Sequence, residues 1–395
     1  MSLIKRLYEL VIIGSIKNTE TVPDVDAWNS FLSELPNPID EVDESYNKYR
    51  CRRYFISGFR RFILNAAALV GLMRGLPCYL TKTRVPKDIN QELLLLVRDT
   101  AVAYDDILPN ELTSKFKHMD VVAATKRFDG SMTHEGKILF RKVLQRHPFS
   151  FYYLLLVMKE ISNHSRYMEE YGAQTTAVYV NERNVASPLI RRLYEERGCC
   201  YDSFMHGEYL YQLIQGFMSF SHFYVWAGSY ADMFADDLRC NCGEYIVYTP
   251  RKLQKKWNLQ EVKNDHFCTY YFSGESTTSI KKLSQLFKEL EGNGLHCVVR
   301  PHPRHSHLDL ISQEFPAEMI EDARSVSIKD SLGSAEYIVG LSSTVLFEAK
   351  AEGKKVVIDD FSNPDIFRNL QKRKFRLLNE EHLLLSEVIR GICCD

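Results

Sequence analysis

The stretch LHCVVRPHPR at residues 295–304 joins a short apolar run to a polar segment in which His302 stands between two prolines. The stretch YIVGLSST at residues 337–344 repeats this arrangement, with a hydroxyl cluster that follows the apolar run and opens a helical pattern. Each apolar run predicts a buried strand. In open parallel sheets, ligands bind outside the carboxyl ends of the strands, and the free N–H groups of a helix N-terminus attract phosphate. The two stretches therefore predict an α/β domain with a phosphate-binding crevice.

Further strands and helices alternate around these two stretches. The pattern predicts strands at 267–272, 326–328 and 355–359 and a helix at 279–290. A polar, proline-marked segment at 249–256 precedes this set and is the expected linker to an N-terminal half. The C-terminal half is therefore expected to form a doubly wound sheet of five strands.

The N-terminal half shows the same alternation. A helix expected at 184–197 ends at Gly198, and a strand at 199–205 follows it. We predict an α/β fold in which two Rossmann-like domains face each other across a cleft. The expected boundaries are 1–248 for an N-terminal domain with a helical lead-in, 249–380 for the C-terminal domain and 381–395 for a terminal helix or tail.

Composition is that of an ordinary globular protein of 395 residues, with 45% hydrophobic residues and a formal net charge of −1. Near-neutrality argues against a nucleic-acid partner, which normally requires a basic excess. The ten cysteines are scattered, and Cys240-Asn241-Cys242 with Cys268 and His266 does not have zinc-ribbon spacing. We expect reduced structural thiols and no essential metal. The pair Asp359-Asp360 stands at a strand end, where a capping role is sufficient.

The N-terminus lacks the apolar core of a signal peptide, and the apolar stretch at 62–73 is too short to span a bilayer. We therefore expect a cytoplasmic protein. Residues 49–73 combine five arginines with aromatic side chains and predict one amphipathic helix. Its basic face is either simply solvated or meets anionic lipid or a charged acceptor glycan. Peripheral contact with the inner face of the cytoplasmic membrane thus stays open.

The candidate phosphate site comprises the residues that follow the C-terminal strands. A glycine-containing loop, an imidazole and hydroxyl groups above a helix suit a nucleotide phosphate. Glu348, in the helix after the hydroxyl cluster, could accept a ribose hydroxyl. The residues expected to bind the nucleotide donor are Gly274, Glu275, Ser276, Arg300, His302, Pro303, Ser342, Ser343, Thr344 and Glu348.

The N-terminal half offers candidates for a general base. His206 and Glu208 follow the strand at 199–205, and a histidine or carboxylate there could deprotonate an acceptor hydroxyl. Asp129 is a second candidate, although Asp129-Gly130 is also typical of a turn. The chain lacks a G-x-G-x-x-G fingerprint, a P-loop and a G-x-S-x-G elbow, which argues against a dinucleotide oxidoreductase, a kinase and an α/β-hydrolase.

Over residues 175–360 the chain resembles the two-domain GT-B glycosyltransferases that use CMP-activated acidic sugars. The resemblance rests on His206-Gly207, the strand YVWA at 224–227, His302-Pro303 and Ser342-Ser343-Thr344 with Glu348. That group includes bacterial sialyltransferases, polysialyltransferases and capsular Kdo-type transferases. The CDP-glycerol polymerases of teichoic acid synthesis look like more distant relatives. The first 150 residues show no such resemblance.

The resemblance implies that the His-Pro pair and the Ser-Ser-Thr cluster bind the CMP part of a sugar donor, with the acceptor on the N-terminal domain. The sialyltransferases carry two acidic residues before a glycine as their base motif. Here Phe128-Asp129-Gly130 has phenylalanine in place of the first acid. The base therefore stays open between Asp129, Glu208 and His206.

These expectations describe an inverting glycosyltransferase of bacterial capsule or lipopolysaccharide synthesis. It would use a CMP-linked nonulosonic acid or Kdo as donor and a glycan or glycolipid as acceptor, without a cofactor. One alternative is transfer of glycerol phosphate or ribitol phosphate from a CDP donor. Another is a catalytically inactive module that binds nucleotide sugars.

Overall fold

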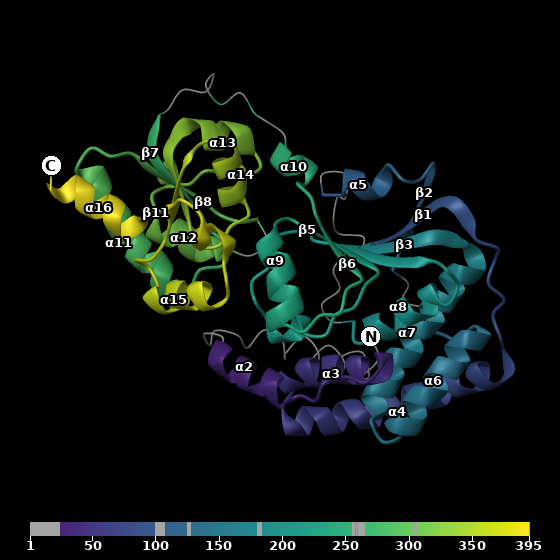
Figure 1. Cartoon of the computed structure of the whole chain (residues 1–395). Helices are drawn as coiled ribbons and strands as arrows, with labels where there is room; N and C mark the ends of the chain where they lie inside the picture. Colours follow the sequence, from purple (N-terminus) through teal and green to yellow (C-terminus); the bar gives the residue numbers. More distant parts are fainter. Residues whose placement is uncertain are drawn as a thin grey trace. The chain divides into compact units, whose positions relative to one another are not determined.

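The computed structural model describes residues 24–98, 107–124, 128–179, 184–254, 257, 259, 265–303 and 306–394. These residues form two compact units, which divide between Pro250 and Arg251 (Figure 1). Each unit contains one parallel sheet with helices packed against it. The fold class is therefore α/β, with two Rossmann-like domains.

Unit 1, residues 24–250, contains a six-stranded sheet in the order β2-β1-β3-β4-β5-β6. Its strands are β1 (Asn90–Arg98), β2 (His118–Ala123), β3 (Ala173–Tyr179), β4 (Cys200–Phe204), β5 (His222–Val225) and β6 (Glu244–Val247). All neighbouring strands in this sheet pair in parallel. The predicted strand at 199–205 is thus confirmed as β4.

The longer helices of unit 1 lie on one side of this sheet (Figure 1). They include α2 (Val25–Glu34), α3 (Glu41–Tyr54), α4 (Gly58–Thr81), α6 (His134–Arg146), α7 (Phe151–Glu170) and α8 (Ser187–Glu195). Tyr201 of β4 stacks on Tyr194 of α8 at 5.7 Å between ring centroids and meets His164 of α7 edge-on. Shorter elements are α5 (Asn110–Thr113), α9 (Gly228–Asp232), a 3₁₀ turn at Leu213–Gln215 and a π turn at Met233–Asp237.

Unit 2, residues 251–394, contains a five-stranded parallel sheet in the order β11-β10-β9-β7-β8. Its strands are β7 (His266–Tyr271), β8 (Cys297–Arg300), β9 (Ala335–Gly340), β10 (Lys355–Ile358) and β11 (Leu383–Leu384). Its helices are α10 (Arg251–Gln254), α11 (Thr277–Gly292), α12 (Leu308–Glu314), α13 (Ile328–Ser334), α14 (Val345–Ala351), α15 (Pro364–Lys372) and α16 (Leu385–Cys394), with 3₁₀ turns at Ala317–Met319 and Arg376–Asn379.

Two elements differ from the sequence predictions. The strand predicted at 326–328 is wrong, because Ser327 caps α13 by accepting the N–H of Asp330 at 3.1 Å. The fifth strand is β11 near the C-terminus, which pairs with β10. The single helix predicted at 49–73 is also wrong, since α3 ends at Tyr54 and α4 begins at Gly58. The helix expected at 381–395 is α16, and its Leu385 belongs to the core of unit 2.

A buried carboxyl group of α3 lies beside α8 and the loop before β6. Glu44 is only 5% exposed, and burial raises its pKa to about 8, although Asn241, Arg191 and Lys48 oppose the shift. Between the ordinary value of 4.5 and about 8, the folded chain holds a proton on Glu44 that the unfolded chain has released. Glu44 therefore lowers the stability of the fold as the pH rises through this window.

We predict that Glu44→Gln flattens the decline of the free energy of unfolding between pH 5 and pH 8, by at most about 1.4 kcal/mol per pH unit. The reason is that glutamine cannot release a proton. Urea unfolding at a series of pH values measures this slope. Glu289→Gln, on the exposed face of α11, is the matched control and should leave the slope unchanged. An unchanged slope in Glu44→Gln would contradict the account.

Candidate functional site

The strand order of unit 2 defines one preferred ligand position. β7 comes first in the chain, β8 pairs on one side of it and β9 on the other. The connections after β7 and β8 therefore leave the sheet in opposite directions, and the switch lies between the carboxyl ends of β7 and β9. Tyr271 and Gly340 pair at this end. Two of the predicted polar loops follow these two neighbouring strands.

The loop after β7 is held in a fixed shape. Gly274 has a φ of +117°, a conformation that favours glycine. The carboxylate of Glu275 is buried and accepts the N–H groups of Ser273 at 2.7 Å and Gly274 at 3.0 Å. Ser276 caps α11 by accepting the N–H of Ser279 at 3.2 Å. The start of α11 is thus fixed beside the switch point, while Glu275 serves the loop itself.

A buried network missed by the sequence analysis connects this loop to the end of β10. The hydroxyl of Tyr270 donates to Asp359 at 2.8 Å and lies 3.5 Å from Glu275. Asp359 also accepts the N–H groups of Phe361 at 3.0 Å and Ser362 at 2.8 Å. The capping role expected for Asp359 is therefore confirmed. The strand pattern could not reveal Tyr270, because a tyrosine in a strand is typical of any core.

The hydroxyl cluster follows β9 directly. Ser342, Ser343 and Thr344 are half-buried, and Ser343 accepts the N–H of Val345 at 3.4 Å. α14 starts at Val345, so the predicted order of strand, hydroxyl cluster and helix is confirmed. Glu348 lies on α14 and is also half-buried. Of the residues predicted for the donor site, this cluster and the loop 274–276 follow the adjacent strands β9 and β7.

His302 and Arg300 have different surroundings. Arg300, the last residue of β8, is 8% exposed, forms an ion pair with Glu321 and donates to the carbonyl of Val326 at 2.9 Å. Its charge is already compensated inside the unit, so these contacts do not support the predicted nucleotide contact. His302 is half-buried, and its backbone N–H donates a hydrogen bond to the hydroxyl of Ser306 at 2.7 Å.

His302 and its exposed neighbour Pro303 lie at the carboxyl end of an edge strand. β8 and β9 flank β7, so their ends are about 10 Å apart. This spacing suits groups that approach one phosphate-bearing ligand from two sides. The sheet therefore gathers the His-Pro pair, the glycine loop and the hydroxyl cluster at one edge.

Unit 1 has a comparable cluster at the carboxyl ends of β4 and β5. The Nδ1 atom of His206 forms a hydrogen bond with the hydroxyl of Tyr209 at 2.7 Å. Glu208 accepts a hydrogen bond from Tyr230 at the start of α9, which follows β5. His206 and Glu208 are both half-buried. The two candidate bases thus lie at the same end of the sheet, and each forms a hydrogen bond with a tyrosine.

Asp129 lies in different surroundings. Its carboxylate accepts from the N–H of Ser131 at 2.9 Å and the hydroxyl of Ser162 in α7 at 3.2 Å. Burial raises its pKa, but the Ser131 hydrogen bond and the ion pair with Arg84 outweigh burial and lower it. Gly130 follows with a φ of +78°, in close approach to Gly75 of α4. The turn alternative accounts for Asp129, and these contacts do not favour it as a base.

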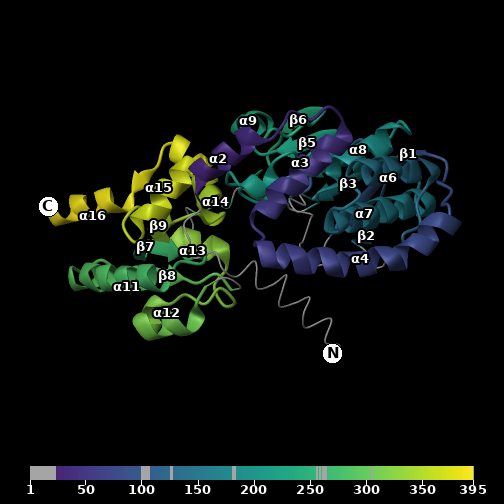
Figure 2. The same cartoon turned by 90° about the horizontal axis from the view of Figure 1, so that it is seen from below.

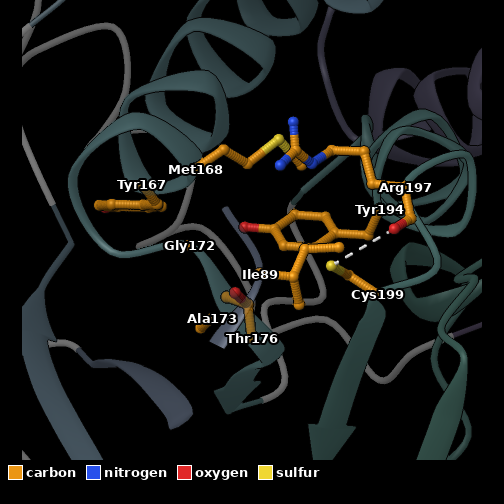
Figure 3. Close-up of a pocket in the computed structure, with 9 residues that line it drawn as sticks. All are labelled: Ile89, Tyr167, Met168, Gly172, Ala173, Thr176, Tyr194, Arg197 and Cys199. Atoms are coloured by element: carbon orange, nitrogen blue, oxygen red, sulfur yellow. Dashed lines mark hydrogen bonds between the residues drawn. The ribbon is translucent and has the colours of Figure 1, made fainter. Parts of the chain in front are cut away.

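The opposite edge of this sheet carries two other features. Figure 3 shows a small pocket at the amino ends of β3 and β4, where the side chain of Arg197 extends toward Met168. Near it, the ligand-type atoms of Cys200, Asp202 and His222 lie within 4.8 Å of one another. The Asp202 carboxylate accepts a hydrogen bond from Nδ1 of His222 at 2.8 Å, which raises the pKa of His222. The contact between Asp202 and His222 accounts for the proximity of these two side chains without a metal. The absence of an essential metal stays a prediction.

Comparison with known proteins finds similarity to solved structures alone. No family model and no curated protein matches it. It is similar to the glycosyltransferase of kitacinnamycin, with 11% identity over 73% of this chain and 84% of that chain and a TM-score of 0.42. It is also similar to the wall teichoic acid polymerase TagF, with 10% identity over 82% of this chain and 85% of that chain and a TM-score of 0.40.

A third similar structure is the UDP-GlcNAc 2-epimerase of Methanocaldococcus jannaschii, in complex with UDP-GlcNAc and UDP. The identity is 12%, over 73% of this chain and 93% of that chain, with a TM-score of 0.40. These values assign neither a family nor an activity to the chain. The α/β assignment rests on the two parallel sheets themselves.

Proposed function

We propose that the chain is an inverting glycosyltransferase that moves a nonulosonic acid of the sialic type, or Kdo, from its CMP-activated donor to a hydroxyl of a glycan or glycolipid. The proposed setting is capsule or lipopolysaccharide synthesis in the bacterial cytoplasm. The choice of CMP sugars rests on the motif resemblance of His302-Pro303 and Ser342-Ser343-Thr344 to that group.

The observation that carries the proposal is the position of these motifs in unit 2. The loop 274–276 and the cluster 342–344 follow the two strands at the switch point, and His302 follows the next strand. A nucleotide phosphate placed there would meet the start of α11, a 16-residue helix whose first N–H groups are directed to this edge. The charge of the phosphate and the dipole of the helix attract each other.

The donor side would stabilise the leaving group. As the bond between the anomeric carbon and the phosphate oxygen breaks, negative charge grows on the departing CMP. A donated hydrogen bond from His302 and the hydroxyls of Ser342 and Ser343 would stabilise that charge more strongly than the charge of the intact donor. Glu348 would accept a hydrogen bond from a ribose hydroxyl of the nucleotide. The sequence gives no reason to invoke a metal for this step.

The acceptor side would supply the base. The acceptor oxygen attacks the anomeric carbon while its proton passes to a side chain of unit 1, and CMP leaves from the opposite face. We assign this role to His206 or Glu208, because both stand at the carboxyl edge of their sheet. Tyr209 and Tyr230 would orient the two candidates through the hydrogen bonds they already form.

A panel of donors tests the proposal. Incubation with CMP-sialic acid, CMP-Kdo, CDP-glycerol and UDP sugars, together with glycan acceptors, should release CMP only from the CMP sugars. CMP alone should also raise the melting temperature more than UMP or GMP, because a ligand that binds only the folded chain stabilises it, by about 2.7 kcal/mol at one hundred times its Kd. Turnover of CDP-glycerol alone would contradict the proposal. CMP binding without turnover of any donor would instead indicate an inactive binding module.

His302→Ala should lower kcat about 100-fold or more, the typical cost of one lost contact to a developing negative charge. Its melting temperature should stay close to that of the parent chain, because His302 is half-buried at a loop. His296→Ala is a matched control, since His296 stands at the amino end of the same strand and pairs with Glu291 at 2.8 Å. Parent-like turnover in His302→Ala would remove this histidine from the mechanism.

A further inference from the structure

α4 presents a continuous apolar stripe to solvent. Its members recur at alternating intervals of three and four residues, so they lie on one side of the helix. Phe59 is 75% exposed, Phe62 73% and Leu80 67%, which is unusual for side chains of this size. The stripe consists of Phe59, Phe62, Ala66, Leu69, Met73, Leu76 and Leu80, all of them exposed.

The other side of α4 is packed against α7. A side chain at Gly71 would lie 3.0 Å from Leu155, and one at Gly75 would lie 2.9 Å from Met158. Asn65 accepts the N–H of Tyr152 at 3.0 Å. The small residues allow the two helices to approach closely, which fixes the direction of the stripe. Figure 2 shows α4 at the periphery of unit 1, with α7 on its inner side.

The length of α4 corrects one sequence expectation. The apolar stretch at 62–73 was expected to be too short to span a bilayer. The helix α4 that contains it has 24 residues and is, by length and composition alone, long and apolar enough to cross a membrane. Only 17% of its most apolar window is buried. However, its packing on α7 ties it to unit 1 along its length. A helix held in this way can lie along a membrane surface with one side immersed.

The segment that carries the stripe holds charge of one sign. Residues 45–87 contain ten lysines and arginines and no aspartate or glutamate, in a chain whose net charge is −1. Lys48 and Arg84 are used inside the unit, where they meet backbone carbonyls and carboxylates. Arg60 and Arg74 lie on α4 next to Phe59 and Met73, and Arg74 is exposed. An apolar stripe bordered by arginines is typical of interfacial helices.

We propose that α4 docks unit 1 on an anionic lipid bilayer, with the stripe immersed at the boundary between headgroups and acyl chains. Two copies joined through the same stripe would bring like charges together, because the segment offers no acidic partner for them. Anionic headgroups would supply that partner for Arg60 and Arg74. This inference does not depend on the proposed transferase activity.

Vesicle co-sedimentation of the full chain tests the docking. Vesicles of phosphatidylcholine with phosphatidylglycerol should bind the chain, pure phosphatidylcholine should bind it at least about tenfold more weakly, and added salt should release it. The double variant Phe59→Ser/Phe62→Ser should weaken binding about tenfold or more. Arg60→Gln and Arg74→Gln should each weaken it about fivefold.

Matched controls replace apolar and charged side chains outside α4. Ile39 and Val247 are exposed apolar residues outside α4, and their replacement by serine should not change binding. Lys282→Gln/Lys288→Gln, on the exposed face of α11, removes two charges and should not change it either. Melting curves of all variants should match the parent.

Two outcomes overturn the proposal. One is equal binding to neutral and anionic vesicles, and the other is binding to neither. In the second case, a dimer in light scattering that Phe59→Ser/Phe62→Ser dissociates would show that the stripe joins two copies instead.

Discussion

The candidate site of unit 2 depends on the parallel pairing of β7 with β9, in which Tyr271 lies opposite Gly340. A side chain at position 340 would lie 3.2 Å from the carbonyl of Tyr271, so glycine permits the two backbones to meet closely there. Because β8 lies on the other side of β7, the chain reverses its winding direction at this pair. The glycine loop and the hydroxyl cluster follow the two paired strands and are brought together for that reason.

Buried polar groups then hold these loops in place. Glu275 fixes the turn before α11, and Asp359 fixes the turn after β10. Tyr270 donates to Asp359 and lies beside Glu275. Each of these groups is nearly inaccessible to solvent, so loss of one partner would leave another unsatisfied at a cost of about 1–3 kcal/mol. A rigid edge of this kind suits a site that must stabilise charge without reorganising.

The strands at the site could be predicted because buried parallel strands contain short continuous apolar runs, as at 297–299 and 337–339. The strand predicted at 326–328 was wrong because two apolar residues, Val326 and Ile328, are too few to outweigh the cap that Ser327 between them provides for α13. Arg300 could not be assigned from the sequence, since its partner Glu321 is 21 residues away. Asp129 shows the same limit, because Arg84 and Ser162 become its neighbours only through the fold.

The central claim is that a nucleotide phosphate binds at the β7–β9 switch point. Hydrogen–deuterium exchange of the full chain, with and without CMP, tests it most directly because it reads the backbone N–H groups expected to meet the phosphate. The account predicts that CMP slows exchange in the segments 276–279 and 342–345, with little change in the sheet of unit 1. Unchanged exchange in both segments, with protection confined to unit 1, would contradict it.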